Sequence, residues 1–228
     1  MIWRLNDVKL TILAVAMAAG LGLQSRVVHA AEEHVLTVAG GCFWCVEADF
    51  EKVPGVREVV SGYTGGTTQN PSYKQVTGGG TGHYEAVQIH FDPALVSRDT
   101  LLSMFLRSVD PTDAGGQFCD RGESYRTAIF VSDQAERALA VSAVSEAEAQ
   151  LGQAVVTPVL PAATFYPAEA YHQDYYKGDN RVLTRFGPIK QSDAYERYRE
   201  GCGRDQRLRQ LCGRRRCPPA AAASLPGR

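Results

Sequence analysis

The chain has 228 residues, of which 44% are hydrophobic, and its 24 basic and 25 acidic side chains give a formal net charge of −1 at pH 7. This near balance excludes the strongly basic face on which nucleic-acid binding depends. The length and the hydrophobic content fit a single domain with a full core, so the fold does not depend on disulfides.

The first 30 residues have the pattern of a secretory signal. Arg4 and Lys9 precede an apolar stretch from Leu10 to Leu23, and Val28-His29-Ala30 supplies small residues at the cleavage positions. The apolar stretch is shorter than the about 20 residues that cross a bilayer, so an uncleaved membrane anchor is the weaker alternative. We expect an exported, periplasmic protein that begins near Ala31 and meets the membrane only through this signal during export.

A short apolar run, Val35 to Val38, predicts a strand, and after two glycines Cys42 opens a segment that we interpret as a helix. A thiol in the first helical turn faces unpaired N–H groups and the positive end of the helix dipole, and both favour the nucleophilic thiolate. Phe43 and Trp44 follow at once and predict an apolar wall beside the sulfur. Two other interpretations stay open, which are a cysteine packed in the core and a pair with Cys45 that forms a structural disulfide or half of a zinc site.

Further strands and helices follow along the chain without strict alternation. Periodicity and turn signals predict strands at Val56–Tyr63, His83–Phe91, Thr127–Val131 and Val155–Leu160, and helices at Leu101–Val109, Ser132–Leu151, Ala168–Tyr176 and Ser192–Arg199. This order favours a two-layer α+β sandwich in one domain over a doubly wound sheet. The composition of residues 211–228 indicates a disordered tail.

The strand at His83–Phe91 carries one acidic side chain on its apolar face. Glu85 shares that face with Val87, Ile89 and Phe91, because side chains alternate along a strand. A carboxyl group there loses solvation, so its pKa should rise and it could stay protonated near neutrality. A protonated carboxyl group beside a thiolate is a general acid beside a nucleophile. The alternative is that Glu85 lies beyond the sheet and points into water.

Other polar side chains in the loops could contact a ligand. Tyr63, Tyr73 and Tyr125 can each donate a phenolic hydrogen bond, although loop tyrosines more often cover the surface. Asp120 is either a turn cap or a ligand contact. His172 fits a partly buried helix histidine better than a base.

Six motifs are spaced along the chain between about Val35 and Arg209. They are Gly41-Cys42-Phe43-Trp44, Gly62-Tyr63-Thr64-Gly65-Gly66, Asn70-Pro71-Ser72-Tyr73, Gly82-His83-Tyr84-Glu85-Ala86-Val87, Gly122-Glu123-Ser124-Tyr125-Arg126 and His172-Gln173-Asp174-Tyr175-Tyr176. In that order they resemble the A-type peptide methionine sulfoxide reductases, whereas any single motif would be unspecific.

The resemblance implies a ferredoxin-like sandwich with a mixed sheet and an enzyme that reduces the S epimer of methionine sulfoxide, free or in oxidised proteins. By the same resemblance, Cys42 attacks the sulfoxide sulfur and becomes a sulfenic acid. Glu85 protonates or hydrogen-bonds the sulfoxide oxygen, with Tyr73 and Tyr125 as further donors.

The resemblance also assigns the binding residues. Phe43 and Trp44 would hold the methyl group of the substrate, and Asp120 would contact the substrate backbone. No metal and no organic cofactor is implied, because a soft nucleophile, a proton and an apolar slot suffice for the reaction.

A resolving cysteine then condenses with the sulfenic acid, and a thioredoxin-like donor reduces the disulfide. Cys202 stands where the family often has a mobile recycling cysteine, so it is the first choice. Cys45, where many members have glycine, and Cys119 are the rivals, while Cys212 and Cys217 could pair with each other.

The expected organisation is a signal at residues 1–30, a reductase domain at 31–210 in a monomeric protein, and the tail from 211. Two other classes of function stay open. The first is an exported thiol–disulfide oxidoreductase that uses the Cys42 and Cys45 pair, which predicts a thioredoxin-like fold and gives the Tyr and Glu motifs no role. The second is a disulfide-stapled binding module without enzymatic activity.

Overall fold

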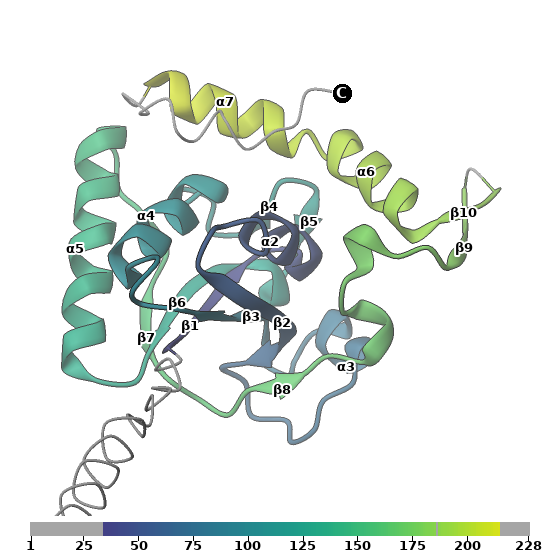
Figure 1. Cartoon of the computed structure of the whole chain (residues 1–228), viewed down its shortest axis with the longest axis horizontal. Helices are drawn as coiled ribbons and strands as arrows, with labels where there is room; N and C mark the ends of the chain where they lie inside the picture. Colours follow the sequence, from purple (N-terminus) through teal and green to yellow (C-terminus); the bar gives the residue numbers. More distant parts are fainter. Residues whose placement is uncertain (1–33, 186, 215–228) are drawn as a thin grey trace, which may run out of the picture. The chain divides into compact units, whose positions relative to one another are not determined.

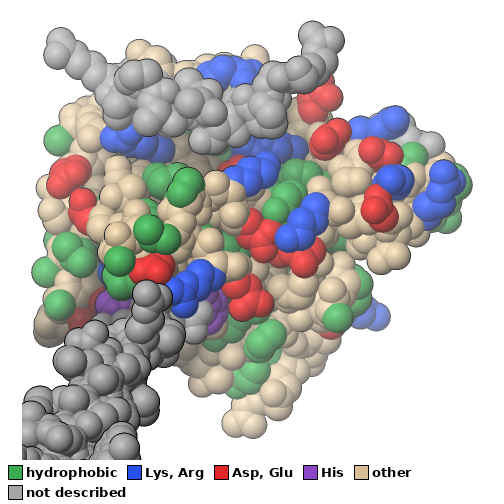
Figure 2. Space-filling model, in the orientation of Figure 1, with side chains coloured by type: hydrophobic (Ala, Val, Ile, Leu, Met, Phe, Trp, Pro, Cys, Tyr) green, Lys and Arg blue, Asp and Glu red, His purple; other side chains and the backbone are tan. Residues whose placement is uncertain are grey.

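The structure is a computed structural model that describes residues 34–185 and 187–214. The expected signal segment, Cys217 and the tail from residue 215 lie outside the described residues. Within the described part, no helix is both long and apolar enough to cross a membrane. Acidic and basic side chains are interspersed on the face shown in Figure 2.

A six-stranded mixed sheet forms the centre of the fold, in the strand order β7-β6-β1-β3-β2-β8 (Figure 1). Its strands are β1 (His34–Gly40), β2 (Val56–Thr64), β3 (Tyr84–Phe91), β6 (Thr127–Val131), β7 (Val159–Pro161) and β8 (Tyr166–Pro167). Neighbouring strands are antiparallel except β6 and β7, which are parallel.

Helices and short ribbons complete the described chain. They are α2 (Phe43–Phe50), α3 (Tyr73–Gly78), α4 (Arg98–Ser108), α5 (Gln134–Leu151), α6 (Gln191–Gly201), α7 (Arg204–Arg214), the 3₁₀ turns η1 (Glu123–Tyr125), η2 (Ala170–His172) and η3 (Tyr175–Lys177), and the ribbons β4 (Gly116–Gln117) with β5 (Asp120–Arg121) and β9 (Arg181–Thr184) with β10 (Gly187–Lys190). The chain order β1-α2-β2-β3-α4-β6, with β6-β1-β3-β2 adjacent in the sheet, is the ferredoxin-like arrangement. The predicted α+β sandwich is therefore confirmed.

One face of the sheet packs against α2, α4 and α5, and α4 and α5 lie side by side (Figure 1). Val38 of β1 and Val87 and Ile89 of β3 point to this face and are fully buried with Phe105 of α4. The alternation of β3 thus places its odd-numbered side chains, Glu85 included, under the helices. The opposite face carries a smaller apolar cluster, against which Leu160 and Phe165 of the segment around β7 and β8 pack.

Two predicted elements differ from the structure. The prediction of a helix at 168–176 is wrong, because Asp174 has a left-handed φ of +56° and separates two 3₁₀ turns. The strand expected at Val155–Leu160 is reduced to β7, since the Val156 N–H donates to the Pro111 carbonyl outside the sheet.

Helix α7 extends through residues 211–214, which the sequence assigned to the disordered tail. Leu211 is 2% exposed, and α7 contacts α4 and α5. The burial of this leucine explains why the helix continues past residue 210, although its composition is strongly charged.

Candidate active site

Cys42 lies at the start of α2, as the sequence predicted. Its backbone angles, φ −54° and ψ 115°, are not helical, so it is the N-cap, and its carbonyl accepts the Cys45 N–H at 3.1 Å. The preceding turn requires glycine, because Gly41 has a φ of +79° and a Cβ there would lie 2.5 Å from Gln117 Cβ. The thiol is therefore fixed between the end of β1 and the start of α2.

Glu85 projects from β3 toward the same helix start. It is 2% exposed and accepts a hydrogen bond of 3.1 Å from the Phe43 N–H. Its position on the buried face of β3 confirms the prediction from alternation, and the alternative of a carboxyl group in water is wrong. Because Phe43 directly follows Cys42, this bond sets the carboxyl group beside the thiol.

Burial raises the pKa of Glu85 to about 8, and the nearby charge of Asp120 acts in the same direction. Hydrogen bonds from the Phe43 N–H and from Tyr125 favour the carboxylate but do not offset burial. At neutral pH the Glu85 carboxyl group therefore keeps its proton and can donate it to a substrate atom.

Tyr73 and Tyr125 lie beside Glu85 and are hydrogen-bonded to each other. Burial raises the pKa of Tyr73 to about 12, and burial also raises the pKa of Tyr125; in both cases the Glu85 charge adds to the effect. Both phenols are therefore neutral and can donate hydrogen bonds. Tyr63 differs, since its hydroxyl already donates to Glu169 at 2.8 Å.

Phe43 and Trp44 begin a cluster of aromatic rings around the thiol. Phe43 is roughly parallel to Tyr73 with ring centres 6.4 Å apart, and Trp44 stacks on Tyr175 at 3.8 Å. His172 is buried 5.0 Å from Phe43, neither of its ring nitrogens has a hydrogen-bond partner in the described chain, and burial lowers its pKa to about 4. His172 is thus a neutral part of the aromatic wall and a weak base.

The two cysteines of α2 are free thiols whose protonation differs from the sequence prediction. Burial raises the pKa of Cys42 well above its usual range, and the hydrogen bond that Cys42 donates to Cys45 raises it further. The prediction of a Cys42 thiolate is therefore wrong, because burial removes the solvent that would stabilise the charged form. The same hydrogen bond lowers the pKa of Cys45.

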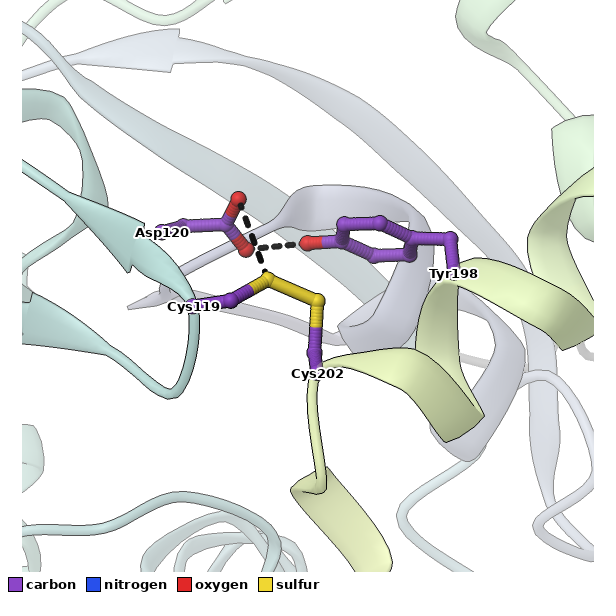
Figure 3. The surroundings of a disulfide bond; sticks show 4 residues. All are labelled: Cys119, Asp120, Tyr198 and Cys202. Atoms are coloured by element: carbon purple, nitrogen blue, oxygen red, sulfur yellow. Dashed lines mark hydrogen bonds between the residues drawn. A yellow bond between two sulfur atoms is a disulfide. The ribbon is translucent and has the colours of Figure 1, made fainter. Parts of the chain in front are cut away.

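Cys202 forms a disulfide with Cys119 and does not lie free beside Cys42 (Figure 3). The bridge ties the end of α6 to the turn between β4 and β5, with the two Cα atoms 5.0 Å apart. The expectation that Cys202 is a mobile free thiol is therefore wrong. Although glycines flank it, Cys202 is held by its bond to Cys119. Cys42 and Cys45 are the two cysteines that the structure describes as free, and they are hydrogen-bonded to each other.

The disulfide lies next to a polar pair at the site. Asp120 follows Cys119, and its carboxylate accepts a hydrogen bond from the Tyr198 hydroxyl, as Figure 3 shows. Burial raises the pKa of Asp120. Tyr198 packs edge-on against Trp44, with ring centres 6.4 Å apart. The bridge thus holds together two segments that each bring a side chain to the thiol.

Tyr175 and Tyr198 were missed from the sequence. Tyr175 lies within the last of the six motifs, where its aromatic ring could have indicated a wall residue. Tyr198 precedes Cys202 by four residues, so a helix there places both on one face. This spacing could have indicated Tyr198 as a site residue only if the position of Cys202 near the site had been known.

Residues 34–202 match the sequence profile of the family described as peptide methionine sulfoxide reductase. The chain belongs to this family. It is 47% identical to peptide methionine sulfoxide reductase MsrA 2 of Caulobacter vibrioides over 206 residues, which cover 90% of this chain and 98% of the relative.

Solved structures of two relatives resemble the fold. Methionine sulfoxide reductase A of Corynebacterium diphtheriae gives a TM-score of 0.58 at 27% identity, covering 69% of this chain and 84% of that one. Mxr1 of Saccharomyces cerevisiae in its reduced form gives 0.63 at 28% identity, covering 71% and 94%. In this peptide methionine sulfoxide reductase the matched residues 34–202 include every site residue named above, whereas α7 begins after them.

Proposed function

We propose that the protein reduces the S epimer of methionine sulfoxide to methionine, in oxidised proteins or as the free amino acid. One observation carries this proposal: the Cys42 thiol adjoins a Glu85 carboxyl group that keeps its proton near neutral pH. Sulfoxide reduction needs both groups, since sulfur must be attacked and the departing oxygen must be protonated.

The reaction balances with these two groups. The Cys42 sulfur bonds to the sulfoxide sulfur while Glu85 gives its proton to the oxygen. The oxygen is then transferred to Cys42 and methionine leaves, so that Cys42 becomes a sulfenic acid and Glu85 regains a proton from the former thiol. A raised thiol pKa fits a cysteine that gives up its proton only as substrate reacts.

The surrounding side chains orient the substrate. Tyr73 and Tyr125 donate hydrogen bonds to the sulfoxide oxygen as negative charge develops there. Phe43 and Trp44 hold the methyl group in their apolar wall. Asp120 accepts a hydrogen bond from the substrate backbone, in competition with the Tyr198 hydroxyl that now occupies it.

Cys45 then condenses with the Cys42 sulfenic acid, forming a disulfide and releasing water. A bridge inside one helical turn would be strained, but Cys42 has non-helical backbone angles, so the pair spans the helix boundary. A thioredoxin-like dithiol reduces this bridge and restores both thiols. In this scheme Cys119 and Cys202 stay paired.

The reductase domain acts as an exported, periplasmic monomer after removal of residues 1–30. The signal pattern supports export, and so does the Cys119–Cys202 disulfide, because such bonds persist in oxidising compartments. The alternative of a thiol–disulfide oxidoreductase is not favoured. That alternative predicts a thioredoxin-like fold, whereas the sheet has the ferredoxin-like order β6-β1-β3-β2.

Turnover of the two separated epimers of a methionine sulfoxide peptide, with dithiothreitol as reductant, tests the function. Chromatography should show methionine formed from the S epimer alone. Equal consumption of both epimers, or of neither, contradicts the proposal.

A further inference from the structure

A buried charged cluster lies behind Cys45 and has no role in the steps above. Arg204 of α7 is 1% exposed and donates hydrogen bonds to Asp49 Oδ2 at 2.9 Å and to the Ser108 carbonyl at 2.6 Å. Asp49 Oδ1 accepts a further bond from Arg199 of α6 at 2.8 Å. Asp49 follows Cys45 by four residues, so both side chains lie on one face of α2. The cluster therefore connects the helix of the reacting cysteines to α6 and α7.

Arg204 has a donor without a partner. Its Nε atom is buried and makes no hydrogen bond to any described residue, and the guanidinium group lies over the Phe118 ring at 4.9 Å. A buried, unpaired N–H of a cation is costly, and a neighbouring anion reduces that cost. Cys45 lies within electrostatic range of Arg204 and can acquire such a charge.

Titratable groups from four elements face Cys45. They are Cys42 at the N-cap of α2, Asp49 on α2, Glu85 on β3, Tyr195, Tyr198 and Arg199 on α6, and Arg204 on α7. Burial raises the pKa of Cys42, Glu85 and both tyrosines, so these four groups are neutral near pH 7. The charged neighbours are therefore the two arginines and Asp49.

The balance among these charges favours an anion at Cys45. Arg199 is paired with Asp205 at 2.7 Å as well as with Asp49. The side chains of Asp49 and Asp205 are 22% and 33% exposed, whereas that of Arg204 is 2% exposed. The hydrogen bond from Cys42 is the largest cause that lowers the pKa of Cys45, and the charge of the buried Arg204 is the next, acting against burial and the partly exposed Asp49.

We propose that Arg204, held in place by Asp49, is a positioning residue that favours the thiolate form of Cys45, the form that condenses with the Cys42 sulfenic acid. The charge of Cys45 does not depend on the proposed function, but the role of the Cys45 thiolate in condensation rests on the proposed function. The Cys45 thiolate attacks the Cys42 sulfur, the S–S bond forms and the S–O bond breaks. The departing hydroxide takes a proton from Glu85 and leaves as water. A thiolate is needed because the neutral thiol is a poor nucleophile.

Thiolate absorbance in the ultraviolet, recorded against pH, reads the charge of Cys45. The full chain carries Cys42→Ser, Cys212→Ser and Cys217→Ser, and the Cys119–Cys202 disulfide is kept oxidised, so Cys45 is the one thiol. Arg204→Gln should raise the titration midpoint by about 1–3 pH units, because a close opposite charge is lost. Arg204→Lys, which keeps the charge, should restore part of the shift.

Asp49→Asn should shift the titration midpoint of Cys45 in the opposite direction to Arg204→Gln. The Asn amide oxygen can still accept the hydrogen bond that positions Arg204, but the counter-charge of Arg199 and Arg204 is lost, so the midpoint should fall. Damage to packing in one network would move both variants in the same direction. An unchanged midpoint in a folded Arg204→Gln protein overturns the proposal. If Arg204→Gln does not fold, Asp49→Asn decides alone, and an unchanged or raised midpoint there overturns it.

A second readout separates this proposal from the proposed function. In the chain with native cysteines, rapid quenching after one equivalent of sulfoxide follows methionine release and Cys42–Cys45 disulfide formation. Arg204→Gln should slow the disulfide step relative to methionine release, by up to about tenfold for each unit by which the midpoint rises above the working pH, because the thiolate fraction falls. An unaltered ratio contradicts the role of Arg204 in condensation. Failure of every chain to release methionine rejects the proposed function, while the absorbance result still decides the charge of Cys45.

Discussion

The Phe43 N–H donates a 3.1 Å hydrogen bond to Glu85 Oε2, although the two residues are 42 positions apart in the chain. The first N–H groups of a helix have no partner within the helix. This bond therefore satisfies the start of α2 and, at the same time, fixes Glu85, the proposed general acid, beside Cys42, the proposed nucleophile. The nucleophile and the acid cannot shift independently, because both are tied to Phe43.

Glu85→Gln tests the proton donor. The amide can still donate a hydrogen bond to the sulfoxide oxygen but cannot transfer a proton, and general acid catalysis is typically worth about 10²–10⁴-fold. We expect kcat/KM with dithiothreitol to fall toward the lower end of this range. A variant within about twofold of the wild type would remove Glu85 from the chemistry.

Glu47→Gln is the matched control for that substitution. Glu47 is also a buried acid, and burial raises its pKa to about 7. Its carboxylate accepts hydrogen bonds from the Ser61 hydroxyl and the Asp174 N–H, away from Cys42. Glu47→Gln should retain turnover, so a loss equal to that of Glu85→Gln would indicate a general effect of altering buried carboxyl groups.

The pH dependence of the first turnover follows from the Glu85 pKa of about 8. Below this pH the carboxyl group is protonated and the wild type should release methionine faster than Glu85→Gln. Above it the wild type loses its acid, so the ratio of the two rates should decline as pH rises. Quenched-flow rates of both proteins from neutral to alkaline pH measure this ratio. A ratio that does not change with pH argues against a titrating Glu85.

Recycling should depend on Cys45. Dithiothreitol can reduce a sulfenic acid directly, whereas a thioredoxin-like protein attacks a disulfide. Cys45→Ser should therefore keep most dithiothreitol-driven turnover and lose most thioredoxin-driven turnover, measured with thioredoxin, its reductase and NADPH. The double variant Cys119→Ser with Cys202→Ser should keep thioredoxin-driven kcat. The reverse pattern would restore Cys202 as the resolving residue.

The Cys119–Cys202 bridge should stabilise the fold and the binding side of the site. It closes a loop of 83 positions, and such bridges typically contribute about 2–4 kcal/mol. The same double variant should lose a free energy of unfolding of this order in urea. It should also show a raised KM, since Asp120 and Tyr198 lose their shared tether. An unchanged unfolding curve would mean that the bridge does not constrain the native domain.

The parts of the site that depend on residues adjacent in the chain could be predicted from the sequence. The alternation of one strand placed Glu85 on the buried face, and two glycines before Cys42 indicated a turn into a helix. The α+β sandwich followed from the mixed element order, and its ferredoxin-like form followed from the resemblance to the family. The first two inferences use a few adjacent residues whose geometry is set by the backbone.

The remaining features depend on contacts between distant segments. The Cys42 pKa is raised by burial, and part of that cover comes from Tyr198 on α6, far along the chain. Arg204 binds Asp49 across 155 positions, and Cys202 meets Cys119 across 83. Spacing along the sequence carries no information on such pairs, so neither the disulfide nor the charged cluster could be derived from it.

The most direct test of the central claim is to locate the sulfenic acid. Cys45→Ser removes the condensing thiol, so the sulfenic acid should persist after one equivalent of sulfoxide and be trapped by dimedone. Mass spectrometry of the digested protein should find the adduct on the peptide that contains Cys42, with the S epimer and not with the R epimer. An adduct on another cysteine, or equal labelling by both epimers, would contradict the account.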